Sequence, residues 1–198
     1  MTEIHLEQSA VQEEPSTDSQ VSTVVVGEHQ EPSKTDSERF KETFGAQAAG
    51  VAIVTAQSPD GEPAGLTISS LSSVSANPPM VAFSFQGRSG SAAKIVDANS
   101  FLVHLVSGEN VEIAQKFATS KYPKFEDEST WGWLPTGEPL VHGIGRVFRV
   151  EPVSRVEADP AVVFIARVTE FVQHETEEIT PVVYHARKFH QLGNHYEI

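Results

Sequence analysis

The segment of this sequence with the clearest chemical potential is a run of hydroxyl side chains between residues 65 and 75 (GLTISSLSSVS). Six hydroxyls fall within nine residues, at Thr67, Ser69, Ser70, Ser72, Ser73 and Ser75. Hydroxyls and backbone N–H groups at this density suit a polar planar ring and a phosphate. The same composition is typical of a serine-rich loop that bonds to its own backbone. The residues alone leave both interpretations open.

A second group of candidate ligands follows a predicted strand at residues 80–85. Residues 91–99 are predicted to form a short helix with Ser91 as its N-cap, and Ser89 lies just before it. Free N–H groups and the helix dipole at such an N-terminus favour an anion. Arg88 could add a charge-assisted hydrogen bond to a phosphate, or it could be a solvated surface residue.

Several other kinds of site are excluded by composition and spacing. The chain has no cysteine, and it lacks the G-x-G-x-x-G, Walker, G-x-S-x-G and H-E-x-x-H motifs. His185, His190 and His195 are spaced by five, so they neither share a helix face nor a strand face, and we predict no metal site. A net charge of −13 argues against binding to nucleic acid or to anionic membranes.

Charge also divides the chain into two parts. Residues 1–36 contain eight acidic side chains and one basic side chain, and only Val21 and Val24 to Val26 form an apolar cluster there. Such a segment buries too little surface to offset its conformational entropy. We therefore predict a disordered acidic tail at 1–36, either without a specific role or as a targeting or partner-binding element, and a folded domain at 37–198.

The folded part is predicted to be mainly β, as a β-barrel with short helices. A helix capped by Asp36 or Ser37 and running through Phe44 precedes a hairpin of strands at 51–55 and 65–69. Further strands are predicted at 80–85, 101–106, 143–153, 161–172 and 182–184, further helices at 91–99 and 110–118, and a long loop at 120–139. A parallel α/β fold would need a helix after nearly every strand, so a barrel is favoured.

The order of these blocks resembles the short-chain flavin reductase family, whose members are FMN-binding split barrels of Greek-key type. The resemblance covers residues 38–192. It rests on 44–55, 60–61, 65–70, Ser75 with Pro78 and Pro79, 101–103, 113–118, 137–140, and 181–184 with Arg187.

The resemblance implies which residues bind the flavin. Hydrogen bonds to the ring edge and ribityl chain would come from Thr67, Ser69 and Ser70, and backbone groups of Ser84, Phe85 and Gln86 would line the isoalloxazine. The phosphate would be held by Arg88, Ser89 and Ser91, and Lys124 with Phe125 would close over the flavin.

The resemblance also implies an activity, an NAD(P)H-dependent flavin reductase. Hydride would pass from NADH or NADPH to N5 of FMN or FAD, and the reduced flavin would leave for a partner monooxygenase. Because the cofactor carries the chemistry, no catalytic side chain is predicted. A cytoplasmic homodimer with flavin sites near its interface is expected.

One block departs from the family pattern. Ala158-Asp159-Pro160 stands where the family commonly has Gly-Asp-His, a motif on the nicotinamide side of the site. Proline has neither a side-chain donor nor an N–H, so nicotinamide use has less support than flavin binding. Two alternatives stay open, a split-barrel flavoprotein with other redox chemistry and a non-enzymatic flavin carrier or sensor.

Overall fold

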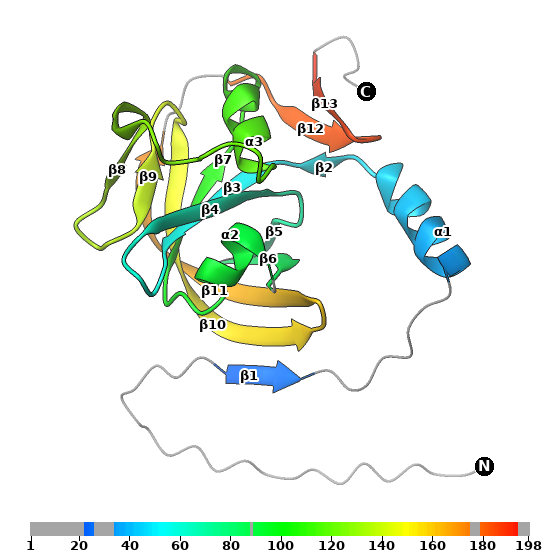
Figure 1. Cartoon of the computed structure of the whole chain (residues 1–198), viewed down its shortest axis with the longest axis horizontal. Helices are drawn as coiled ribbons and strands as arrows, with labels where there is room; N and C mark the ends of the chain where they lie inside the picture. The colour runs from blue at the N-terminus through cyan, green and yellow to red at the C-terminus, as the bar shows by residue number, and fades with distance from the viewer. Residues whose placement is uncertain (1–21, 26–33, 88, 175–178, 194–198) are drawn as a thin grey trace, which may run out of the picture.

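The main sheet of the protein curls into a barrel (Figure 1). A computed structural model describes residues 22–25, 34–87, 89–174 and 179–193. The sheet order is β4-β3-β7-β10-β11-β6-β5, with every neighbouring pair antiparallel. Its strands are β3 (Ala52–Gln57), β4 (Pro63–Ile68), β5 (Ser72–Ala76), β6 (Pro79–Gln86), β7 (Phe101–Leu105), β10 (Arg146–Ala158) and β11 (Ala161–His174).

One hydrophobic core joins the two ends of this sheet. Ala64 and Ile68 of β4 pack in the same buried cluster as Phe83 and Phe85 of β6, although these strands are not paired. Alternate residues of β6 point inward, as expected for a strand with one buried face. The rings of Phe83, Phe85, Phe101 and Phe164 form the centre, with centroids 5.2 to 6.4 Å apart.

Smaller elements surround the barrel. A three-stranded sheet contains β2 (Ala49–Gly50), β12 (Val182–His185) and β13 (Lys188–Gln191), and a hairpin contains β8 (Trp131–Trp133) and β9 (Pro139–Val141). The α-helices are α1 (Lys34–Gly45), α2 (Gly90–Ile95) and α3 (Val111–Phe117), and short 3₁₀ turns occur at Gly108–Asn110 and Glu128–Thr130. Helix α1 projects from the side of the barrel (Figure 1). No helix in the described ranges is long and apolar enough to span a membrane.

The structure corrects some predicted boundaries. The N-cap of α2 is Ser89 and not Ser91, because Ser89 has the extended backbone conformation of a cap and the helix begins at Gly90. This helix ends at Ile95, four residues earlier than predicted. The predicted loop at 120–139 contains β8 and the first residue of β9, and β13 was not predicted.

Regular structure also occurs inside the segment predicted as a disordered tail. Ser22–Val25 form β1, which pairs in parallel with Ser154 to Glu157 of β10. This edge is available because β7 pairs only with residues 147–150 of β10, and Val24 and Val25 favour strands. Helix α1 begins at Lys34, also within that segment. For residues 1–21 and 26–33 the prediction lies outside the described residues.

Candidate active site

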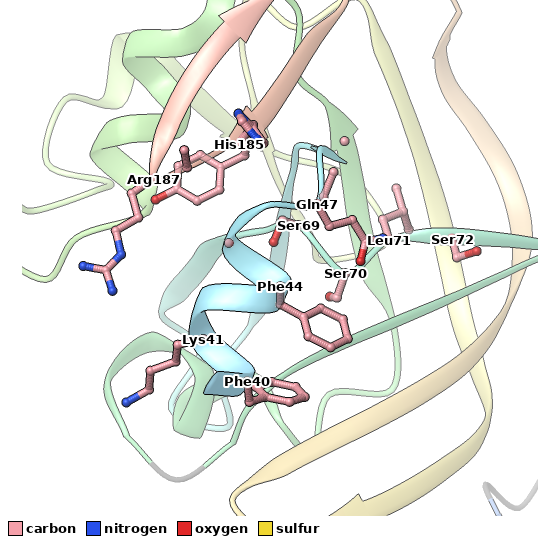
Figure 2. A pocket seen from close by; sticks show the side chains of 15 residues that line it. Phe40, Lys41, Phe44, Gln47, Ser69, Ser70, Leu71, Ser72, His185 and Arg187 are labelled. Atoms are coloured by element: carbon pink, nitrogen blue, oxygen red, sulfur yellow. The ribbon is translucent and has the colours of Figure 1, made fainter. Parts of the chain in front are cut away.

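A cavity of about 770 Å³ lies between α1, the β4–β5 connection and the β12–β13 hairpin (Figure 2). Its lining includes Ser69, Ser70 and Leu71 from the connection with Ser72 of β5, Phe40, Lys41 and Phe44 from α1, and Tyr184, His185 and Arg187 from the hairpin. A second cavity of about 300 Å³ shares Ser69 and Tyr184 with the first and adds Thr67, Gln115 and Phe189. Both volumes are in the range of small-molecule sites.

The three hydroxyls predicted to bind the ring have different surroundings. Thr67 Oγ1 donates to the carbonyl oxygen of Ala114 at 2.7 Å, which ties β4 to α3. Ser70 Oγ donates to the carbonyl oxygen of Ser84 at 2.6 Å and accepts its N–H at 3.0 Å. The Ser69 side chain has no hydrogen-bond partner in the described part of the chain, and it lines both cavities. Of the three, Ser69 therefore has the hydroxyl that is free for a ligand.

Of the three predicted phosphate ligands, Ser91 contacts Lys124, the residue predicted to close over the flavin. Lys124 Nζ donates to the carbonyl oxygen of Gly65 at 2.8 Å and to Ser91 Oγ at 2.9 Å, which joins the long loop to β4 and α2. Burial lowers the pKa of Lys124. One of its three N–H donors is left for another acceptor. Ser89 is exposed and its side chain makes no capping bond, and Arg88 lies outside the described residues.

The residue types fit a flavin mononucleotide in two separate groups, because Ser69 and Tyr184 line both cavities whereas Lys124 and Ser91 line neither. A ring would find the free hydroxyl of Ser69 and the half-buried ring of Tyr184 at the junction of the two cavities. A phosphate would find a cation at Lys124, close to Ser91.

Residues 44–193 match the family described as "Flavin reductase like domain". The chain belongs to this family. An NADH:FMN oxidoreductase of Rhodococcus erythropolis is 37% identical over 145 residues, which cover 72% of this chain and 75% of that protein. The reductase component of a 4-nitrophenol 4-monooxygenase/4-nitrocatechol 2-monooxygenase from Rhodococcus opacus is 37% identical over 92 residues, covering 46% and 49% of the two chains.

A solved structure shows the same fold. The flavin reductase domain protein from Arthrobacter sp. FB24 superposes with a TM-score of 0.73 at 31% identity, over 82% of this chain and 99% of that chain. The predicted family and the mainly β, split-barrel fold class are thereby confirmed.

The remaining residues predicted for this flavin reductase family member, like Lys124 and Ser91, do not line the two cavities. The Phe85 side chain packs in the barrel core, and Gln86 is exposed at the end of β6. Phe125 contacts Phe117 and Trp131, with centroids 5.3 and 5.1 Å apart, and lines neither cavity. The Ser84 backbone bonds to Ser70, so its role toward a ring stays a prediction.

The block that departs from the family pattern forms the tip of the β10–β11 hairpin. Ala158 pairs with Ala161, so Asp159 and Pro160 make the turn. The carbonyl oxygen of Pro160 accepts the N–H of Gly87 at 3.2 Å, which places the tip beside the end of β6.

Sequence reasoning missed the part of the cavity made by α1 and the β12–β13 turn. The spacing of Phe40 and Phe44 shows that they share a helix face, but it does not show that this face borders a cavity. The turn residues Ala186 and Arg187 have φ values of 48° and 63°. Left-handed backbone is unusual for alanine and arginine. The turn also lacks the Asn-Gly pair that usually predicts a two-residue hairpin turn from sequence.

Proposed function

We propose that this chain is a flavin reductase that transfers hydride from NADH to FMN. Membership of the flavin reductase like family carries the proposal, together with a relative named as an NADH:FMN oxidoreductase. Inside the site, the supporting observation is the free Ser69 hydroxyl at the junction of two cavities. FMN, when bound, supplies the hydride acceptor for this reaction.

The protein's own residues have binding and positioning roles. Ser69 would donate a hydrogen bond to the ring edge, while Thr67 and Ser70 hold the shape of the segment through Ala114 and Ser84. Lys124 would bind the phosphate and is held near it by Ser91. Holding two rings in contact accounts for a large part of the acceleration in such a reaction, because it replaces a bimolecular encounter.

The test is anaerobic stopped-flow absorbance at the oxidised-flavin band. Protein with FMN, and separately with FAD, is mixed with NADH and with NADPH. We expect rapid bleaching with FMN and NADH, and the other three combinations decide the flavin and nicotinamide preferences. Bleaching no faster than the enzyme-free rate in every combination would contradict a flavin reductase.

The reduced flavin is proposed to supply a flavin-dependent monooxygenase. This proposal rests on the Rhodococcus opacus relative, which is named as a reductase component. We place the reaction in the cytoplasm, where NADH is available. The partner is tested by coupling: substrate oxidation by a two-component oxygenase should depend on this chain and NADH.

A homodimer is proposed from the exposure of α1. Phe40 and Phe44 stack with their centroids 4.5 Å apart, yet they are 62% and 56% exposed. Two adjacent exposed aromatic rings on a projecting helix are an apolar surface suited to a second copy. Both residues also line the larger cavity, so the second copy would border the site.

A further inference from the structure

The larger cavity has an electrostatic character opposite to that of the whole chain. The sequence has a net charge of −13. No described carboxylate lines this cavity, and its formally charged lining residues are Lys41 and Arg187. Neither cation forms an ion pair with another described residue. A local excess of cations in an acidic protein indicates a site for an anion.

The two cations come from elements that the fold holds together. Lys41 is on α1 and Arg187 is in the β12–β13 turn, and the N–H of Ala186 donates to the carbonyl oxygen of Gly45 at 2.9 Å. Figure 2 shows Lys41 and Arg187 on one side of α1, with the rings of Phe40 and Phe44 on its other side. Ala186 and Arg187 both have left-handed backbone, the usual conformation of a two-residue hairpin turn, and this hydrogen bond ties the turn to the end of α1.

Among the described residues, two carboxylates line a pocket that adjoins this pair on its outer side. Lys41 and Arg187 also line an adjoining surface pocket of about 510 Å³, and Glu38 and Glu42 border that outer pocket. Lys41 and Arg187 line both spaces, so the two cations lie at the boundary between the cavity and the outer pocket, whereas the two carboxylates line the outer pocket alone.

We propose that Lys41 and Arg187 form the subsite for the diphosphate of the nicotinamide dinucleotide. The inference rests on the proposed function, because it assigns one part of that substrate to one part of the cavity. Arg187 can bond two phosphate oxygens through its planar guanidinium, and Lys41 supplies a point charge. The subsite offsets the repulsion that a dinucleotide meets from an acidic protein.

The experiment compares two hydride donors. NADH carries the diphosphate, whereas N-benzyl-1,4-dihydronicotinamide has the same reactive ring without phosphate. Lys41→Gln and Arg187→Gln should each raise KM for NADH by about tenfold, with kcat, the Kd for FMN and KM for the uncharged donor unchanged. Arg39→Gln on α1 and Lys188→Gln beside the turn are the matched controls, since both remove one exposed cation that does not line the cavity.

Direct binding separates this inference from the proposed function. NAD⁺ is titrated into the wild type and into the Lys41→Gln/Arg187→Gln double variant by calorimetry. Binding to the wild type alone, without NADH-driven flavin reduction, would support the subsite and overturn the reductase. Equal KM for NADH in the cavity variants and the control variants would overturn the subsite and leave the reductase standing. Neither turnover nor NAD⁺ binding by the wild type would overturn both.

Discussion

The side chain of Ser70 joins the end of β4 to β6 through two hydrogen bonds to the backbone of Ser84. Its hydroxyl donates to the Ser84 carbonyl oxygen at 2.6 Å and accepts the Ser84 N–H at 3.0 Å. Ser84 is on β6 at a point that β5 no longer pairs, because the β5–β6 ladder ends at Ser72 and Ala82. The Ser70 hydroxyl thus makes the two hydrogen bonds to the Ser84 backbone that a residue of a neighbouring strand would otherwise make.

Ser70→Ala is expected to lower the free energy of unfolding by about 1 kcal/mol, since this is the typical net contribution of a hydrogen bond to stability. Urea unfolding measures the change. Ser69→Ala is the matched control, because the Ser69 hydroxyl has no partner among the described residues. That control should leave stability unchanged and raise the Kd for FMN about fivefold. A larger loss of stability in Ser69→Ala than in Ser70→Ala would contradict this division of roles.

His104 makes stability depend on pH. It is fully buried between β3 and β9, with Nδ1 3.2 Å from the carbonyl oxygen of Ile53, and Nε2 accepts the N–H of Val141 at 3.1 Å. Burial lowers the pKa of His104 to about 4. The unfolded chain therefore binds a proton at this residue between pH 6.5 and 4 while the folded chain does not.

Stability should accordingly fall as the pH drops from 6.5 to 4, by about 3 kcal/mol from this residue, and should not change above pH 6.5 through it. Urea unfolding at several pH values measures the slope. His104→Asn keeps a donor for Ile53 without titrating, so the slope should be smaller in this variant. A wild-type slope retained in His104→Asn would show that other groups cause it.

The proposed dimer predicts a change in mass on removing the α1 aromatics. The Phe40→Ser/Phe44→Ser variant should elute at the chain mass by size exclusion with light scattering, whereas the wild type should have twice that mass. The variant should keep its fold, because both rings are largely exposed in the single chain. Tyr122→Ser, which removes a ring that is 62% exposed elsewhere, is the control. A dimeric double variant would locate the interface on another surface.

Most strands of the barrel could be predicted from the sequence because each has a pattern within its own residues. Alternation in segments such as 80–85, the Asp60-Gly61 turn and the hydroxyl run each identify one element without reference to the rest. The β12–β13 turn could not be predicted, since Ala186 and Arg187 adopt the left-handed conformations of a two-residue hairpin turn although their residue types rarely do so.

The sequence could indicate which residue types belong to the candidate site, but it could not indicate the role of each residue. The hydroxyl run correctly drew attention to Ser69, but nothing in the sequence distinguishes it from Ser70, because the distinction depends on a strand fourteen residues away. Lys41 sits in an ordinary charged helix sequence, and its place beside Arg187 arises from tertiary contacts alone. Local sequence patterns do not predict such contacts between distant segments.

Lys124 is expected to distinguish phosphorylated from unphosphorylated flavin. Its amino group lies within hydrogen-bond distance of Ser91 and Gly65 and has one donor to spare. Lys124→Met should raise the Kd for FMN about tenfold, the usual worth of a charge-assisted bond, and should leave the Kd for riboflavin nearly unchanged. Fluorescence titration measures both, with Lys121→Met, an exposed lysine of the same loop, as control.

The pH dependence of this binding has a definite sign. Burial lowers the pKa of Lys124, so its positive charge is lost at a lower pH than that of an ordinary lysine. FMN affinity of the wild type should therefore decline on moving to alkaline pH, while riboflavin affinity and the Lys124→Met variant should not follow that decline. Equal weakening of FMN and riboflavin in Lys124→Met would instead show that the lysine acts only by holding the loop against β4 and α2.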